Sequence, residues 1–479
     1  MKLEHEVSLR WLLRFAFPTI FSSVFANLYT TVDGIFVAHW VNTDALSAIN
    51  IVLPMIYLAS ALGMMFGSGG NALVAKKLGE GRTREAREDF SLLMAVAFAF
   101  SVVLSAVCFL FLEPLCRFLG SDTALLPYCR AYMTPVLLTL PFAVFGMVFQ
   151  LSFITVGRAG LGAALSVAGG VLNIVLDWLF MGVFHWGLTG AAIATGIGYA
   201  TSSVVGTVWF CLNRKQVLYV VRPRWRPETI LQSCANGSSE MVNILAFSVV
   251  TVLFNRILMD FAGSDGVASL TIIWYAQELY GGLFRGYISG ISPVVSYNLG
   301  RGDRLRLNRL FRISLWTLGV TAAAVTAVSY LFGGTVVSVF AKGNANVTAI
   351  ALHGFSIAAV SFPMMAYNIF SSGWFTALND GKTSAILSFC RTIVFMVLPV
   401  LVLPRLFEID GVWLSLAAGE VLSIVMSVYA DSRPLRPWIV CRSLVRGFRH
   451  HLQLYHGGCP QADGCSDTVV SSISASDDH

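Results

Sequence analysis

Two acidic residues lie in stretches apolar enough to be buried in a membrane, and their chemistry stands out in this chain. Asp33 and Asp177 both fall within long hydrophobic runs, and no Lys or Arg of the first half lies at a comparable depth. Ionisable residues inside a membrane are costly and usually functional. A buried carboxyl without a fixed counter-charge holds a proton or binds a cation. The pair therefore predicts a site for an exchangeable positive charge.

The neighbours of these carboxyls favour a site lined by oxygen atoms. Three pairs of residues are spaced by four, which places both members on one face of a helix, namely Tyr29 with Asp33, Asn173 with Asp177, and Ala191 with Thr195. Carboxylate, amide, hydroxyl and carbonyl oxygens suit a hard cation such as Na⁺, or a shared proton, rather than zinc or copper. We therefore expect a cation site that holds Na⁺ or H⁺ and includes Asp33, Asn173, Asp177 and Thr195.

The sequence repeats itself once, at an offset of 221 residues. Leu78-Gly-x-Gly81 matches Leu299-Gly-x-Gly302, and Ser68-Gly69 matches Ser289-Gly290. At this offset the polar residues of the predicted site are replaced by Phe254, Val394, Leu398 and Leu416. Two copies of one bundle, with chemistry in only one of them, indicate a transporter rather than an enzyme or a scaffold. The alternative is that the polar groups form a hydrogen-bonded network that closes the bundle.

The elements that carry these residues are predicted to be transmembrane helices. Hydrophobic residues make up 56% of the 479 residues and charged residues 12%, whereas soluble domains carry about 25% charged residues. Runs of about 20 apolar residues cross a bilayer. We predict an all-α integral membrane protein with twelve transmembrane helices, at 12–38, 46–73, 90–112, 131–155, 163–182, 188–212, 234–261, 267–297, 311–339, 347–377, 384–404 and 411–430.

Charge placement orients the predicted bundle. One set of loops, with both termini, holds 25 of the 32 Lys and Arg residues, and the opposite side holds five. Such asymmetry places both termini in the cytoplasm of a multi-pass protein of the cell membrane. Each repeat has an even number of helices, so the pseudo-twofold axis should run along the membrane normal. We expect an N-lobe at 1–212, a basic cytoplasmic linker at 213–233, a C-lobe at 234–430 and a tail at 431–479 that is disordered from about 457.

Further polar residues lie within the predicted helices. Gln150, Gln277, Glu240 and Glu278 are candidates for lining a substrate cavity together with Tyr29. Glu278 and Arg285 are seven apart on one helix face, while Arg391 and Glu420 lie on consecutive helices and could form a buried pair. For these four charged residues we favour a structural role. Pro18 lies inside the first helix, where a proline removes a backbone donor and can act as a hinge.

Several function classes find no support in the sequence. The glycine-rich segments lack the spacing of a P-loop or of a dinucleotide-binding motif, so no ATP site and no cofactor are expected. The nine cysteines show no zinc-binding spacing, although Cys116 and Cys129 could both reach the outer face and pair. No catalytic cluster can be derived from spacing. An enzyme, a channel and a nucleic-acid-binding protein are therefore not favoured.

Taken in order, these motifs resemble the multidrug and toxic compound extrusion (MATE) family, over residues 10–430. The resemblance rests on the helix from Pro18 to Asp33, the two Leu-Gly-x-Gly loops, Asn173-x-x-x-Asp177 and Gly190-Ala-Ala-x-Ala-Thr195. The stretches Asn236-Gly-Ser-Ser-Glu240 and Ser296-Tyr-Asn-Leu-Gly300 look like a bacterial branch near the DinF-like and MepA-like members.

The resemblance implies two six-helix lobes around a V-shaped cavity, in a monomer that exports small organic cations in exchange for Na⁺ or H⁺. It also implies an N-lobe cation site at Asp33, Asn173, Asp177, Ala191 through its carbonyl, and Thr195. Some members use acidic residues of the C-lobe as well; Glu240 fits that role, but the tenth helix, at Tyr367 and Asn368, lacks an aspartate of one branch. A lipid-linked oligosaccharide flippase of the same superfamily is the alternative, and would call for a more basic cavity.

Overall fold

The computed structural model describes residues 7–40, 43–119, 121, 123, 125–341 and 345–455. Side chains at 30–35, 37–40, 43–47, 50, 264, 336, 339–341 and 432–455 are outside the description. The chain separates into two units, Met1–Ser427 and Val428–His479. The expectation of disorder from about residue 457 lies outside the described residues. All that follows concerns the first unit.

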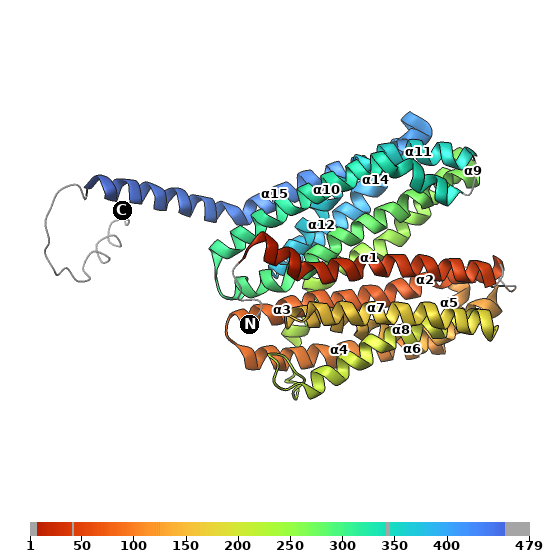
Figure 1. The fold of residues 1–479 in the computed structure, drawn as a ribbon, viewed down its shortest axis with the longest axis horizontal. Helices are drawn as coiled ribbons and strands as arrows, with labels where there is room; N and C mark the ends of the chain where they lie inside the picture. Colours follow the sequence, from red (N-terminus) through yellow and green to blue (C-terminus); the bar gives the residue numbers. More distant parts are fainter. Residues whose placement is uncertain are drawn as a thin grey trace, which may run out of the picture. The chain divides into compact units, whose positions relative to one another are not determined.

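The first half of this unit consists of helices with two π-helical turns (Figure 1). In chain order they are α1 (Leu9–Trp40), α2 (Thr43–Met64), η2 (Met65–Gly69), α3 (Gly70–Gly79), α4 (Thr83–Leu110), α5 (Leu112–Phe118), α6 (Leu126–Thr155), α7 (Ala159–Asp177), η3 (Trp178–Val183) and α8 (Gly187–Leu212). The predicted spans 46–73 and 163–182 thus each contain a π-helical turn. Cys116 and Cys129 are both buried and free.

The second half follows a fourteen-residue linker and is also helical. Its elements are α9 (Pro227–Gly300), α10 (Arg304–Ala341), α11 (Ala345–Ala359), α12 (Phe362–Ala377), α13 (Gly381–Phe389), η4 (Cys390–Val394), α14 (Phe395–Val402) and α15 (Pro404–Tyr455). The backbone of α9 breaks at Gly263, whose φ of 60° and ψ of −149° only glycine adopts readily. This break separates two arms that correspond to the predicted spans 234–261 and 267–297.

By length and composition, ten described helices can cross a membrane, or eleven if α11 and α12 form one span. These two helices are bent by 53° relative to each other, and Pro363 lies in the first turn of the second. The second arm of α9 does not meet the same criterion, although it is long enough. It carries Gln277, Glu278 and Arg285, and these polar side chains lower its mean hydropathy below that of its neighbours.

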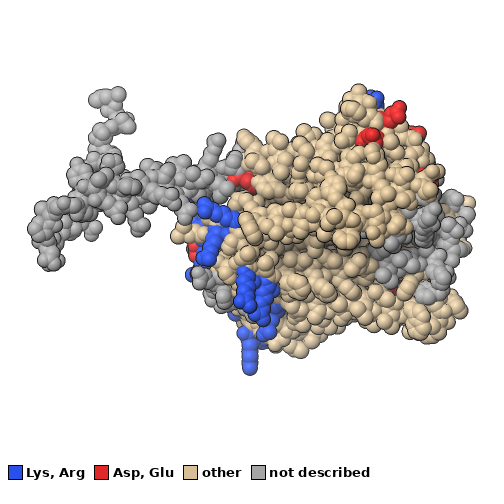
Figure 2. All heavy atoms as spheres, turned by 45° about the horizontal axis from the view of Figure 1, so that its top comes forward, with Lys and Arg blue, Asp and Glu red and all other residues tan. Residues whose placement is uncertain are grey.

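The surface agrees with a membrane-embedded belt. Figure 2 shows Lys and Arg gathered at one end of the face drawn and a broad region without charge beside them. Large apolar side chains are exposed on many helices, for example Phe17, Leu110, Leu331 and Val425. An exposed apolar surface of this extent is expected where lipid is the solvent. The fold is therefore an all-α integral membrane fold, as predicted.

The two halves meet closely where α3 and η2 cross α9, and glycines form the crossing. A Cβ built on Gly79 would overlap the carbonyl of Tyr297, and one built on Gly300 would overlap the carbonyl of Lys76. These two contacts are equivalent under the offset of 221, so the repeated Leu-Gly-x-Gly loops pack against each other. A second crossing brings Gly69 against Gly237. The backbones of the halves touch at this end of the bundle, which we call the glycine seam (Gly69, Gly79, Gly237 and Gly300).

The linker at 213–226 lies along α4 and is held there by side chains. Arg87 donates from Nε to the Val217 carbonyl at 2.8 Å and from Nη1 to the Tyr219 hydroxyl at 3.0 Å, and its guanidinium lies 4.3 Å from the centre of the Tyr219 ring. The Val221 N–H donates to Ser91 Oγ at 2.8 Å. The linker is therefore attached to the first half, and α9 begins at Pro227, inside the segment predicted as linker.

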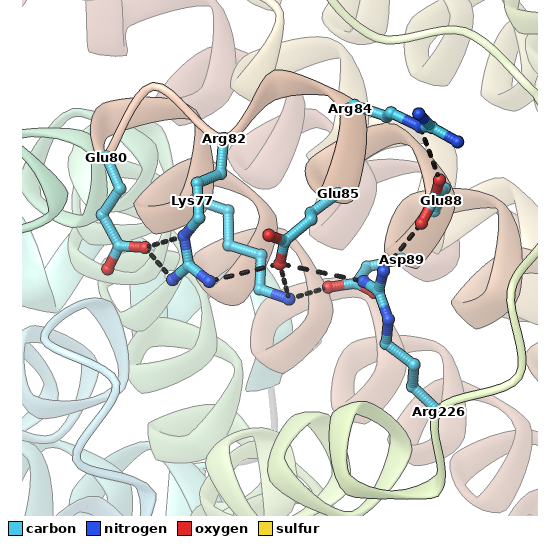
Figure 3. A network of polar contacts seen from close by, with 8 residues as sticks. All are labelled: Lys77, Glu80, Arg82, Arg84, Glu85, Glu88, Asp89 and Arg226. Carbon is cyan, nitrogen blue, oxygen red and sulfur yellow. Dashed lines mark hydrogen bonds and ion pairs between the residues drawn. The ribbon is translucent and has the colours of Figure 1, made fainter.

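A network of charges fixes the end of this linker (Figure 3). Asp89 on α4 is fully buried and binds both Lys77 and Arg226. Arg226 Nη1 lies 2.8 Å from Asp89 Oδ1, and its Nη2 lies 2.7 Å from Glu88 Oε2. At the surface the network continues through further ion pairs, which involve Glu80, Arg82, Arg84 and Glu85. Because Arg226 directly precedes α9, the network ties the start of the second half to α3 and α4.

Candidate functional site

Two glycines allow α7 and α8 to approach each other closely. A Cβ built on Gly169 would lie 2.6 Å from the carbonyl oxygen of Gly198, and one built on Gly198 would lie 2.9 Å from the carbonyl oxygen of Gly169 and 3.3 Å from Cβ of Asn173. No larger residue fits at either position without separating the helices. The close approach brings Asn173 of α7 next to Thr195 of α8.

The polar side chains predicted on these two helices meet. The buried Asn173 donates from Nδ2 to Thr195 Oγ1 at 3.4 Å, and this hydroxyl donates to the Ala191 carbonyl at 3.0 Å. The amide oxygen of Asn173 therefore remains an acceptor. Asp177 lies one turn further along α7 on the same face and is fully buried. It is the last residue of α7, directly before the π-helical turn η3.

The first helix passes the same place. The rings of Phe25 and Tyr29 cover Gly170 on α7, where a Cβ would lie 2.8 Å from each ring. Gly170 precedes Asn173 by less than one turn, so Tyr29 is near the polar cluster. The side chain of Asp33 lies outside the described residues, although its backbone continues α1 one turn beyond Tyr29. The helix continues through Pro18, and its hinge role stays a prediction.

The repeat-related positions in the second half have a different environment. Phe254 and Leu416 are buried, but Leu398, the counterpart of the buried Asp177, is 57% exposed. The polar residues are therefore not features that the repeated fold requires. Within the part of the chain whose side chains are described, no group of three or more His, Cys, Asp or Glu is arranged to hold a metal ion.

A buried ion pair lies in the second half instead. Arg391 Nη2 is 2.7 Å from Glu420 Oε1, and the two side chains are 17% and 4% exposed. Asn368 donates from Nδ2 to Glu420 Oε2 at 2.6 Å and accepts at Oδ1 from the Ser427 hydroxyl at 3.0 Å. The pair foreseen from the sequence is thus present. Its carboxylate is fully engaged, which favours the structural role.

Glu240 belongs to a different environment, between the halves. It lines a cavity of about 30 Å³ together with Ser68 and Asn71 of the first half and Ser289, Ser292 and Thr376 of the second. A volume of this size holds one or two water molecules. In the part of the chain whose side chains are described, no hydrogen bond or ion pair engages the Glu240 carboxylate. Arg285 and Arg391 are the charged groups that act on it electrostatically.

The remaining candidates lie on α6 and on the second arm of α9. Arg285 Nη2 is 2.6 Å from Glu278 Oε2, so these residues form the pair that their spacing indicates. Gln277 directly precedes Glu278 and is half-buried. Gln150 on α6 donates to the Ser22 hydroxyl of α1 at 3.3 Å. These residues therefore lie along α1, α6 and the second arm of α9, away from the cluster at Asn173.

Two residues of this region escaped the sequence analysis. Gly281 and Gly282 lie between Glu278 and Arg285, and both are buried against polar groups. Each glycine inside a helix costs about 1 kcal/mol relative to alanine. Two consecutive glycines inside an apolar helix, between two charged residues, could have indicated from the sequence that this position has a special role.

Comparison with known proteins places this geometry in a family. The MatE family profile matches residues 18–179 and 241–401, which are two segments separated by nearly the offset of the repeat. The multidrug export protein MepA of Staphylococcus saprophyticus is 21% identical over 414 residues, covering 86% of this chain and 90% of that protein. MepA of Staphylococcus aureus is 22% identical over 415 residues, with the same coverage.

Solved structures share the fold. A MATE protein crystallised in complex with MaL6 superposes with a TM-score of 0.85 at 20% identity, covering 90% of this chain and 97% of that chain. An outward-facing multidrug resistance MATE transporter of the MOP superfamily superposes with a TM-score of 0.83 at 21% identity, covering 88% and 95%. The two-lobe membrane fold, the repeated profile match and the coverage agree, and the chain belongs to the MatE family.

Proposed function

We propose that this protein is a secondary active antiporter that exports organic cations in exchange for Na⁺ or H⁺ by alternating access. The observation that carries the proposal is the convergence of Asn173, Thr195 and the Ala191 carbonyl one turn from the buried Asp177. These groups supply oxygen ligands for a hard cation or a shared proton. The relatives named as multidrug export proteins support the class of substrate.

The coupling ion acts on the first lobe in this proposal. Na⁺ or H⁺ enters from the outside and neutralises Asp33 and Asp177, and the packing of α1 against α7 changes at Tyr29 and Gly170. One charge moving inward through −100 mV supplies about 2.3 kcal/mol. That free energy drives export only because the two states of the protein bind the ion with different affinity.

The organisation of the lobes completes the proposal. The N-lobe comprises residues 1–212 and the C-lobe 234–430, and the end with the glycine seam faces the cytoplasm. The substrate enters between the two lobes, where Tyr29, Gln150, Glu240, Gln277 and Glu278 are the candidate contacts. The acidic groups of this space, Glu240 and Glu278, favour cations over the phosphate-bearing lipid of a flippase. The protein acts as a monomer.

Transport by everted membrane vesicles tests the site. Ethidium export is measured under a Na⁺ gradient and under a pH gradient for the wild type, Asp177→Asn and Asp260→Asn. Asp260 is an exposed acid of α9, so its variant controls for the loss of one negative charge. We expect Asp177→Asn to abolish ion-driven export while Asp260→Asn retains it. Undiminished coupled export by Asp177→Asn would refute the assignment.

A further inference from the structure

The ion pair between Glu278 and Arg285 lies on an open face of α9 rather than in the core. The two side chains are 42% and 41% exposed, and the closest nitrogen and oxygen atoms are 2.6 Å apart. Half-exposed ion pairs contribute little to stability. Fixed charges inside a membrane span are nevertheless costly. The pair therefore calls for a reason other than packing.

Two consecutive glycines shape the helix around this pair. A Cβ on Gly281 would lie 2.9 Å from Nη1 and 3.3 Å from Cζ of Arg285. The absence of a side chain allows the guanidinium to lie along the helix and reach Glu278 two turns away. A Cβ on Gly282 would lie 2.7 Å from Nδ2 of Asn27, the atom that donates to the Glu278 carbonyl at 2.8 Å. Asn27 thus packs α1 against the α9 backbone between Glu278 and Gly282.

Two tyrosines lie in the neighbourhood of Glu278. Tyr275 precedes it by almost one turn and is 47% exposed. Tyr57 of α2 lies within electrostatic range of both Glu278 and Tyr275. A carboxylate beside aromatic rings is a recognition site for organic cations, because both the charge and the ring faces attract them. The guanidinium of Arg285 now occupies the position that such a cation would take.

Arg285 has a second acidic neighbour. It acts electrostatically on Glu240, as Arg391 does, but Arg391 is already bound to Glu420 at 2.7 Å. Among the described residues, none forms an ion pair with the Glu240 carboxylate. Arginine has a long side chain with several rotatable bonds, and the cavity beside Glu240 has room for one or two waters. Arg285 is therefore the cation that can change partner between the two carboxylates.

We propose that Arg285 is a resident competitor for the substrate, an inference that rests on the export of organic cations proposed above. In the protein without substrate, Arg285 forms an ion pair with Glu278. An incoming organic monocation displaces the guanidinium and pairs with Glu278 itself, and Arg285 then pairs with Glu240. Glu278 is paired in both states, with Arg285 before the substrate binds and with the substrate afterwards, so its charge is not left uncompensated. The competitor also weakens binding, which assists release, and it excludes ligands without a positive charge.

Ethidium binding to the purified protein in lipid nanodiscs, measured by fluorescence anisotropy, tests the proposal. Arg285→Gln should lower the dissociation constant about threefold, the size expected for removing a partly exposed ion pair. Gly281→Ala keeps both charges but displaces the guanidinium, and it should shift the constant in the same direction. Glu278→Gln should raise the constant, and the double variant Glu278→Gln/Arg285→Gln should match Glu278→Gln alone, because Arg285 acts through Glu278.

Matched controls and an additional variant sharpen the result. Arg256→Gln removes a charge elsewhere on α9, and Gly319→Ala adds a methyl group on α10 where no atom lies within 4 Å. Both should leave binding unchanged. Glu240→Gln removes the second partner, so it should weaken binding more in the wild type than in Arg285→Gln.

Unchanged or weaker binding by Arg285→Gln would overturn the competitor while leaving organic-cation export in place. If Arg285→Gln is not monodisperse by size exclusion, Gly281→Ala decides, and its failure to tighten binding would count against the proposal. A wild-type protein that neither binds nor exports ethidium or any other organic cation would remove the proposed function itself, and the competitor with it.

Discussion

Adding a single methyl group at the glycine seam should prevent this end of the bundle from closing. At Gly79 a Cβ would overlap the Tyr297 carbonyl and would lie 2.9 Å from its carbon atom and 3.2 Å from the Arg301 nitrogen. At Gly300 it would overlap the Lys76 carbonyl and would lie 3.0 Å from the Glu80 nitrogen. These neighbours are backbone atoms, so no side chain can move aside, and the two halves must separate.

The size of the effect follows from the cost of overpacking, which is about 1–3 kcal/mol per site. Each 1.4 kcal/mol changes an equilibrium constant about tenfold. Gly79→Ala or Gly300→Ala should therefore shift the ratio of closed to open seam toward open by about five- to 140-fold. The double variant should shift it by less than the product, because loops separated for one methyl group accommodate the other. Alanine favours the helix itself by about 1 kcal/mol, so the folded protein should persist.

Distance measurement between spin labels checks this prediction. Labels on cysteines at position 84, which is 94% exposed on α4, and at position 305, which is 72% exposed on α10, report the two sides of the seam. The native cysteines are replaced beforehand. Gly79→Ala should lengthen the distances, and Gly319→Ala, which meets no atom within 4 Å, should not. Unchanged distances in folded Gly79→Ala would show that the seam is not closed in the populated state.

Three further results are expected. Asp89→Asn leaves Lys77 and Arg226 without their buried carboxylate, so the free energy of unfolding should fall by about 3 kcal/mol. Thermal unfolding in detergent measures this loss. The control Glu85→Gln, at a side chain that is 38% exposed, should lower the free energy of unfolding by less than about 1 kcal/mol. Glu420→Gln strands the Arg391 guanidinium and should destabilise by about as much as Asp89→Asn, while Glu408→Gln, at an exposed position of α15, should not. Burial, followed by the influence of Cys129, raises the pKa of the Cys116 thiol, so maleimide should label Cys116 more slowly than the exposed Cys211 at neutral pH. The rate at Cys116 should continue to rise at pH values where an ordinary thiol has reached its plateau; equal rates at both cysteines would contradict this reasoning.

Local patterns in the sequence predicted much of this protein. Hydrophobic runs located the helices, and spacing by four residues placed Asn173 and Asp177 on one face of α7. The bond between Asn173 and Thr195 confirms that these polar residues meet. The repeat located the two Leu-Gly-x-Gly loops, because a duplicated loop keeps its glycines wherever the backbone requires them. The cation site as a whole stays a prediction, since the side chain of Asp33 lies outside the described residues.

Contacts between distant segments could not be predicted in the same way. The attachment of the linker to α4 joins Arg87 to Tyr219 across more than a hundred residues, and no periodicity encodes such a partner. The loops of the seam were visible, but not that they touch each other. The bend between α11 and α12 lies beside Pro363, yet a proline in a helix predicts a kink without its angle. The exposure of Glu278 and Arg285 could not be predicted either, because it depends on how the neighbouring helices pack.

The attachment of the linker makes the junction of Arg226 with Pro227 a fulcrum. The linker before it is bound to α4, so a rotation of α9 relative to the first half would pivot near the first residues of α9. The first arm of this helix has 37 residues and, at about 1.5 Å per residue, is a lever about 55 Å long. A tilt of about 10° at the fulcrum sweeps the far tip through about 10 Å. A small separation of the glycine seam, which lies close to this pivot, would therefore correspond to a much larger displacement at the far end of the first arm of α9.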